Sequence, residues 1–468
     1  MTYTLEQFEH DALPTLVAYG AIECISPAFE TNWQTLGHIN AAAELLAEWA
    51  RSRELLGATV AIHQMEGRTP VITVDVPASD PLSDGTTTVL YGHLDKQPPL
   101  GNWSDGLHPF RAVRRGDQLF GRGLADDGYS LFAALLAIEE AQRQGHVLGR
   151  CVVLIEASEE SGSPDLEPYL DSLADFLGNV TLLICLDSGA LTYDRLWVTT
   201  SLRGISQANV TVRVLERGQH SGAASGVVPS SFRILRHLMD RLEDSETGDI
   251  ILPQLWADIP QSHRDAATSV AEEFGDVAAE HQPFASGVDP MGGDAAERIL
   301  RHTWWPTLST VGASGLPEVA IAGNVLRPFT TLAFSFRLPP TVKHDVAATA
   351  IRSALTHGIP HNAEIEIDID GANGWVAPES APWLAQALEA GSQIGFSQSP
   401  GFAGEGGSIP FLATLGERYP GVQFVATGVL GPKSNAHGID EMLHLPTAVG
   451  VINAVAVILA AAARKENS

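Results

Sequence analysis

The hydrophobic and polar positions of the first 200 residues follow two periods in turn, as expected when strands and helices alternate. Residues 71–76, 86–95, 150–158 and 181–188 are short runs rich in Val, Ile, Leu and Thr, the lengths and compositions typical of strands. Residues 126–145 instead carry apolar side chains at helical spacing before a glycine ends the pattern. Unbroken apolar strands such as the last two are typical of sheets buried on both faces. The pattern predicts an α/β domain with a mixed sheet flanked by helices.

The pattern changes near Gly204. Residues 205–217 predict a strand, and residues 229–244 predict a helix with one apolar stripe. Residues 364–370 alternate strictly between charged and apolar positions, as does a strand with one solvated face. The first pattern then returns with a helix, a strand and a final apolar helix. We therefore expect one domain from residues 1–202 and 377–468, with residues 203–376 forming an inserted α+β domain.

The net charge, the first residues, the longest apolar run and the cysteines limit the kinds of partner and the cellular location that we expect. The chain has 56 acidic and 28 basic residues, and the resulting net charge of -28 disfavours binding to nucleic acid or to anionic lipid. The first residues mix Glu, His and Asp with apolar positions, unlike a signal peptide, so we expect a cytoplasmic protein. The longest apolar run, near the C-terminus, is interrupted by Asn453 and predicts a buried helix. Three cysteines imply no disulfide framework.

Side chains suited to divalent metals follow the predicted strands or lie in glycine-rich turns. They are His93, Asp126, Glu160, Asp187 and His437. Each alone has a plainer explanation, because loops are rich in hydrogen-bonded Asp and His. Together they occur in GHLD, GRGLADDG, EASEESGS, CLDSG and SNAHG, in succession, and the carboxyl ends of strands in an open α/β sheet meet at one edge. The succession indicates one shared metal site.

These motifs, in this order and over almost the whole chain, resemble the M20 family of metallopeptidases, especially its carnosinase-like dipeptidases. The resemblance implies a phosphorylase/hydrolase-like catalytic domain with an inserted α+β sandwich that serves as lid and dimerisation domain. It implies two divalent ions per subunit, zinc being expected and manganese or cobalt the alternatives. The implied ligands are His93 and Asp187 on one ion, Glu160 and His437 on the other, and Asp126 bridging both. Asp95 would orient His93, and Asp127 is expected only to cap the next helix.

The same resemblance implies a reaction. Glu159 is the expected general base, moving a proton between a metal-bridging hydroxide and the leaving amine. The expected function is hydrolysis of the amide bond of dipeptides or short peptides, as a dipeptidase or carboxypeptidase. Two alternatives stay open: deacylation of N-acyl amino acids by the same site, and a non-catalytic binding protein of the same fold.

Substrate contacts are implied by further motifs. His220 in RGQHSG would reach into the active site of a partner subunit and donate to the carbonyl oxygen of the scissile bond of the substrate there. This role implies a homodimer. The plainer alternative is a histidine that caps the following turn. Arg337 would bind the substrate carboxylate, Asn324 would add a polar contact, and Gly406, Gly407 and Ser408 of GEGGSIP would present amides and a hydroxyl. A plain glycine turn is the alternative for GEGGSIP.

Three positions depart from the pattern of carnosinase-like members. Gly404 replaces an arginine before EGGSIP, Gly128 replaces a lysine after the two aspartates, and Asn373 stands where a second histidine is expected. The predicted metal chemistry is intact, whereas recognition of the substrate is expected to differ.

Overall fold

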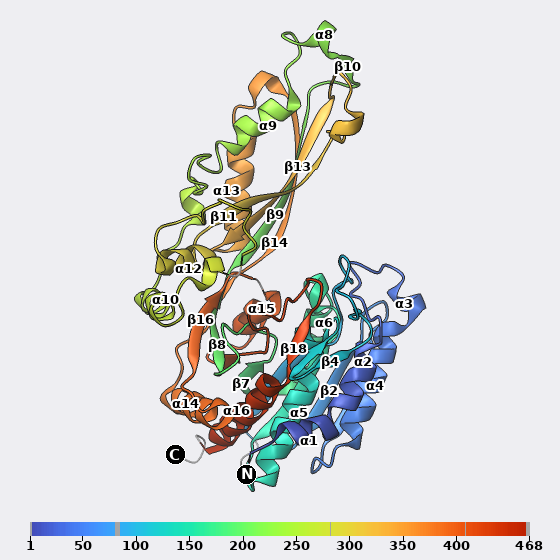
Figure 1. Ribbon diagram of the computed structural model, residues 1–468, viewed down its shortest axis with the longest axis vertical. Helices are drawn as coiled ribbons and strands as arrows, with labels where there is room; N and C mark the ends of the chain where they lie inside the picture. Colours follow the sequence, from blue (N-terminus) through green and yellow to red (C-terminus); the bar gives the residue numbers. More distant parts are fainter. Residues whose placement is uncertain (1, 80–84, 281, 408, 465–468) are drawn as a thin grey trace. The chain divides into compact units, whose positions relative to one another are not determined.

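The chain forms two compact units in the computed structural model, which describes residues 2–79, 85–280, 282–407 and 409–464 (Figure 1). Unit 1 comprises residues 1–200, 377–402 and 414–468, and unit 2 comprises residues 201–376 and 403–413. The segment 403–413, which we expected in the first domain, packs with unit 2. One reason is that the buried Arg203 donates from Nε to the carbonyl oxygen of Gly406 at 3.2 Å.

Unit 1 is built on a six-stranded mixed sheet. In order across the sheet its strands are β1 (Thr59–His63), β2 (Val71–Val76), β6 (Arg150–Glu156), β3 (Thr87–His93), β7 (Val180–Cys185) and β17 (Gln423–Ala426). Neighbours from β6 to β17 pair in parallel, while β1 and β2 add an antiparallel edge. Every residue of β3 is buried, as expected for a central strand of a sheet that is covered on both faces. The parallel strands therefore all end at one edge of the sheet.

Long helices cover this sheet and carry most of the core. α4 (His38–Ser52) packs on β1 and β2, and α5 (Ser130–Arg143) packs on β3 and β6. α16 (Leu445–Arg464) packs on α5 and on α14 (Pro382–Phe396).

Among the described residues, α16 is the one helix long and apolar enough to cross a membrane, but 83% of its apolar window is buried inside the protein. Asn453, which interrupts the apolar run, exchanges two 2.9 Å hydrogen bonds with the backbone of Tyr3. The expected buried helix is confirmed.

The other elements of unit 1 are short. They are α1 (Leu5–Asp11), α2 (Leu13–Gly20), α3 (Trp33–Leu36), β4 (Val113–Arg115), β5 (Gln118–Phe120), the π-helical turn η2 (Leu124–Gly128), the 3₁₀ turn η3 (Glu159–Ser161), α6 (Leu166–Ser172), α7 (Ala174–Leu177) and β18 (Met442–His444). β18, β5 and β4 form a small sheet in that order. Three elements share residues between the units: β8 (Trp197–Leu202), β16 (Gly401–Glu405) and α15 (Pro410–Arg418).

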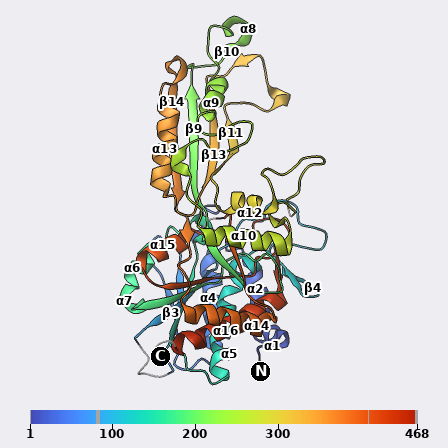
Figure 2. The ribbon, with the colours of Figure 1, turned by 90° about the vertical axis from the view of Figure 1, so that its left-hand side faces the viewer.

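Unit 2 contains a four-stranded antiparallel sheet. Its order is β11 (Thr307–Ser314), β13 (Phe329–Leu338), β9 (Gly204–Arg213) and β14 (Glu364–Ala372). α9 (Ser231–Met239) and α13 (His344–Thr356) pack against it and share an apolar core with it (Figure 2). Side chains of β14 alternate between exposed and partly buried, as expected for a strand with one solvated face. The α/β fold with a second α+β unit is thus confirmed.

The central strands of unit 2 continue beyond the sheet as a ribbon. β10 (Gln219–His220) follows β9 and pairs with β12 (Val325–Leu326), which precedes β13. The remaining elements are α8 (Ser221–Ala224), η4 (Pro253–Leu255), α10 (Gln261–Phe274), α11 (Val277–Glu280), α12 (Ala295–Thr303), η5 (Val319–Ile321), η6 (Pro360–Asn362) and β15 (Trp375–Val376).

Candidate metal centre

The ends of β3 and β7 place two predicted ligands beside a third from η2. His93 is the last residue of β3, Asp187 follows β7, and Asp126 lies in η2. The Nε2 atom of His93 is 3.4 Å from Oδ1 of Asp126 and 3.7 Å from Oδ2 of Asp187. All three residues are buried. The sheet edge therefore gathers one imidazole and two carboxylates, as the sequence predicts.

A second group shares Asp126 with the first. Nε2 of His437 is 3.1 Å from Oδ2 of Asp126 and 3.2 Å from Oε2 of Glu160. Glu160 comes from η3, just after β6, and His437 comes from the turn before β18. The two oxygens of Asp126 thus face different groups, Oδ1 toward His93 and Oδ2 toward His437. This is the arrangement that a carboxylate shared between two cations requires.

The donor atoms fit two divalent cations. In each group the three ligand atoms lie within 4.8 Å of one another, close to the separation of about 4 Å across an ion whose ligands lie at about 2.0 to 2.2 Å. Oxygen and imidazole donors suit zinc, manganese and cobalt. In addition, the buried Nε2 of His93 has no hydrogen-bond partner among the residues that the structure describes. A buried, unpaired imidazole nitrogen among carboxylates is the position that a metal ion would fill.

Asp95 links the first group to the glutamate pair. Nδ1 of His93 is 3.1 Å from the carbonyl oxygen of Asp95 and 3.5 Å from its carboxylate. A carbonyl only accepts, so Nδ1 carries the proton and Nε2 presents its lone pair. The fully buried carboxylate of Asp95 accepts from the backbone amides of Glu159 and Glu160, both at 3.1 Å. Asp95 therefore orients His93 mainly through its backbone, and its side chain positions η3.

Glu159, the expected general base, differs from its neighbour Glu160 in its contacts. Its carboxylate makes no hydrogen bond or ion pair with the described residues, in contrast to Glu160, which accepts from Gln97 at 2.6 Å. Burial, together with the charge of nearby Asp187, raises the pKa of Glu159 well above its usual value. Gln97 was missed by sequence reasoning, because a glutamine after HLDK carries no distinctive signal.

The electrostatics of the cluster call for positive charge. Burial raises the pKa of Asp126, whereas the hydrogen bond from His437 and the nearby imidazole of His93 lower it, and the net result is well below its usual value. Burial lowers the pKa of His437, but Asp126 and Glu160 raise it to about 11. Buried carboxylates therefore draw a proton onto the imidazole of His437. Divalent cations would satisfy the same negative charge.

The expected cap at Asp127 is wrong. α5 begins at Ser130, and its N-terminus has no side-chain cap. Oδ2 of Asp127 instead accepts from the backbone amide of His93 at 3.1 Å. This approach requires Gly92, because a Cβ there would lie 2.6 Å from Asp127 Oδ2 and 2.1 Å from Ser130 Oγ. Asp127 thus holds the end of β3 against η2.

Comparison with known proteins decides the family. Residues 89–465 match peptidase family M20/M25/M40. The chain belongs to this family. A cysteinylglycine-S-conjugate dipeptidase of Corynebacterium striatum is 25% identical over 412 residues, which cover 85% of each chain. The human Beta-Ala-His dipeptidase is 26% identical over 399 residues, covering 80% of this chain and 76% of its own.

A solved structure extends the likeness to the fold. The di-peptidase Dug1p of Saccharomyces cerevisiae superposes with a TM-score of 0.78 at 20% identity, covering 98% of this chain and 97% of its own. The expected resemblance is confirmed, and the protein is a metal-dependent peptidase of the M20 family.

Two predicted substrate contacts of this M20 peptidase lie together in unit 2. Arg337, on β13, pairs with Thr307 of β11, and Thr307 Oγ1 accepts from Arg203 at 3.4 Å. Arg203 also donates to the carbonyl of Gly406. Burial, and the neighbouring charge of Arg337, lower the pKa of Arg203 to about 9. Two guanidinium groups therefore lie near the glycine turn, where Gly407 is exposed; Ser408 lies outside the described residues.

His220 and Asn324 lie together at the far end of the ribbon. His220 pairs with Val325, and the backbone amide of Ser221 donates to the carbonyl of Asn324 at 2.9 Å. Nδ1 of the exposed His220 accepts from the amide of Gly222 at 3.1 Å and so caps α8. The cap that we held as the alternative is present. It also leaves the ring proton on Nε2.

The three departures have structural explanations. At Gly404 a Cβ would lie 2.6 Å from Ser201 Oγ, and at Gly128 it would lie 2.2 Å from the ring of Tyr19, so neither site accommodates a long side chain. The ammonium of the buried Lys96 lies over the same Tyr19 ring, 4.1 Å from its centre. Asn373 accepts from the backbone amide of His344 at 2.9 Å and anchors α13.

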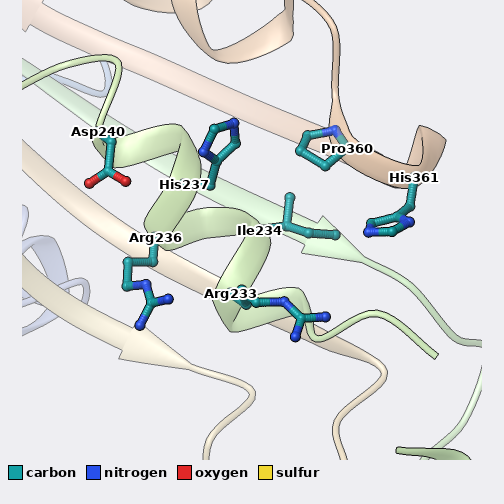
Figure 3. Close-up of a pocket in the computed structure, with 7 residues that line it drawn as sticks. All are labelled: Arg233, Ile234, Arg236, His237, Asp240, Pro360 and His361. Atoms are coloured by element: carbon teal, nitrogen blue, oxygen red, sulfur yellow. The ribbon is translucent and has the colours of Figure 1, made fainter. Parts of the chain in front are cut away.

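A pocket of about 410 Å³ lies elsewhere in unit 2, between α9 and η6 (Figure 3). It is lined by Arg233, Ile234, Arg236, His237, Asp240, Pro360 and His361. None of the predicted site residues is among them. The pocket therefore does not belong to the candidate site.

Proposed function

We propose that this protein is a dinuclear metal-dependent dipeptidase that hydrolyses the amide bond of dipeptides or short peptides with a free C-terminal carboxylate. The single observation that carries the proposal is the position of Asp126, whose two oxygens face His93 and His437 respectively. Membership of the M20 family and the dipeptidase names of the relatives support the same substrate class. The proposed metal is zinc, with manganese or cobalt as alternatives.

The residues divide the work. When bound, the two divalent ions supply Lewis-acid polarisation of the carbonyl and lower the pKa of water. Glu159 accepts a proton on its carboxylate and delivers it to the leaving nitrogen, since its side chain is free to change partners. Arg337 and the amides around Gly407 bind the C-terminal carboxylate of the substrate. The bidentate geometry of a guanidinium suits this anion.

A second subunit is part of the proposal, and the geometry of unit 2 supports it. His220 ends β10, whose partner β12 precedes β13, and Arg337 lies next to the far end of β13, so the two residues are at opposite ends of this ribbon. Figures 1 and 2 show β10 beyond the end of β13. The strand from Phe329 to Arg337 alone spans about 26 Å, at about 3.3 Å per residue. An extended dipeptide spans only about 7 Å. One chain therefore cannot bring both side chains to one dipeptide, whereas His220 of a second copy can join Arg337 of the first.

Mixing two inactive variants tests the role in trans. Neither His220→Ala nor Glu159→Gln should hydrolyse dipeptides well alone. After random exchange of subunits, the mixed dimers would contain one intact site each, so activity should return to about a quarter of the wild-type value. Activity that stays at the level of the separate variants would exclude a role of His220 in the partner subunit.

A substrate panel tests the reaction. The purified protein loaded with zinc, manganese or cobalt is assayed with Cys-Gly, β-Ala-His and N-acetyl and N-succinyl amino acids, before and after chelation. The proposal predicts metal-dependent cleavage of the dipeptides. Preference for the N-acyl amino acids would favour a deacylase, and turnover of none would favour a binding protein.

We further propose a cytoplasmic location, which the three free, buried cysteines support.

A further inference from the structure

A fully buried ion pair joins the two loops that carry Asp126 and His437. Nη1 of Arg122 donates to Oε2 of Glu441 at 2.7 Å, and the exposed fractions of the two side chains are 1% and 0%. Arg122 precedes Asp126 by four residues, and Glu441 follows His437 by four residues. The pair therefore connects segments more than 300 positions apart in the sequence.

The carboxylate of Glu441 accepts hydrogen bonds from three backbone amides. Oε2 accepts from the amide of Gly123 at 2.9 Å, and Oε1 accepts from the amides of Ala125 at 3.1 Å and Asp126 at 3.2 Å. Successive backbone amides around one anion form the kind of concave site that binds phosphate in other folds. Here the anion comes from the protein itself. The amide of Asp126, the shared candidate ligand, is one of its three backbone donors.

Arg122 acts on the other loop. Its Nη2 donates to the carbonyl of Gly438 at 2.5 Å, directly after His437. The backbone amide of Gly121 donates in turn to the carbonyl of Glu441 at 3.0 Å. One guanidinium and one carboxylate thus fix the backbone beside both Asp126 and His437. The distance of 3.1 Å between Asp126 Oδ2 and His437 Nε2 depends on these two backbone positions.

We propose that Arg122 and Glu441 are positioning residues of the metal centre. They hold the backbones of Asp126 and His437 in register, so that the shared carboxylate presents one oxygen to each cation. Neither side chain contacts the candidate ligand atoms. This inference rests on the proposed function. The competing explanation is an ion pair that stabilises the fold without affecting metal binding.

Metal affinity separates the two explanations. Glu441→Gln keeps the shape of the side chain but turns an NH₂ group toward backbone donors, and Arg122→Lys keeps the charge but cannot reach both partners. Glu140→Gln is the matched control, because Glu140 is also fully buried in unit 1 and accepts from Arg143 at 2.9 Å, within α5. Each metal-free protein is titrated with Zn²⁺ against a chromophoric chelator, and the visible spectrum of the Co²⁺ form is recorded. Melting temperatures are measured in chelator.

We expect zinc affinity to fall about 10- to 100-fold in Glu441→Gln, which is the usual effect of losing a residue that orients a metal ligand without binding the metal itself. The visible bands of the Co²⁺ form should also change. Arg122→Lys should show a smaller loss, which keeps the test valid if Glu441→Gln does not fold. Glu140→Gln should keep both readouts. Lower melting temperatures with unchanged affinity and spectra in both test variants would overturn the inference. Wild-type protein that binds no divalent metal would instead overturn the proposed function.

Discussion

Replacing Glu159 by glutamine removes the proposed proton carrier and leaves every candidate metal ligand in place. The carboxylate of Glu159 makes no hydrogen bond or ion pair with the described residues, so the substitution loses no contact, and the melting temperature should not fall. Its backbone amide still donates to Asp95. A positioned general acid or base contributes about 10²- to 10⁴-fold, which raises the barrier by about 2.7 to 5.5 kcal/mol. We therefore expect kcat to fall by this factor with metal content unchanged.

The assay measures kcat for a dipeptide, metal content by mass spectrometry and melting temperature on the same preparations. Glu160→Gln, one position along, is the informative comparison. Glu160 lies 3.2 Å from His437 and should lose metal together with activity. A Glu159→Gln protein that keeps kcat within about threefold of wild type, or that loses as much metal as Glu160→Gln, would refute the assigned role.

Three further predictions concern residues that position the metal ligands or bind the substrate. Asp95→Asn places an NH₂ group against a buried amide donor, so it should lower the free energy of unfolding by about 1 to 3 kcal/mol and weaken zinc binding. Denaturation and competition with a chelator measure the two effects, and unchanged values would contradict the role of the Asp95 carboxylate. Gly92→Ala puts a Cβ 2.1 Å from Ser130 Oγ and should cost about 1 to 3 kcal/mol, whereas Gly149→Ala, at an open position before β6, should be neutral in the same melts. Arg337→Lys should raise KM for free dipeptides more than for their C-terminal amides in steady-state kinetics. An equal effect on both substrates would show that Arg337 does not bind the carboxylate.

The candidate ligands could be predicted because they stand where the sequence pattern changes. His93 ends one predicted strand and Asp187 follows another, and parallel strands end at a common edge of the sheet. Glu159 and Glu160 follow another such run. Local pattern and topology together are therefore enough to gather these side chains.

Contacts made by the backbone could not be predicted in this way. Asp127 has the sequence position of a helix cap, and only the close approach of β3 at Gly92 reveals that it binds the amide of His93. Glu441 was not singled out from the sequence, although its carboxylate accepts from three amides of a distant loop. Asn453 reads as an interruption of an apolar helix until Tyr3 is seen to pair with it. Each of these depends on a partner that no local pattern identifies.

Anomalous diffraction from crystals loaded with zinc tests the central claim most directly. We expect two peaks per chain about 3.5 to 4 Å apart, one beside His93 and Asp187, the other beside Glu160 and His437, with one oxygen of Asp126 next to each. A single peak, or none, at saturating zinc would contradict a dinuclear centre.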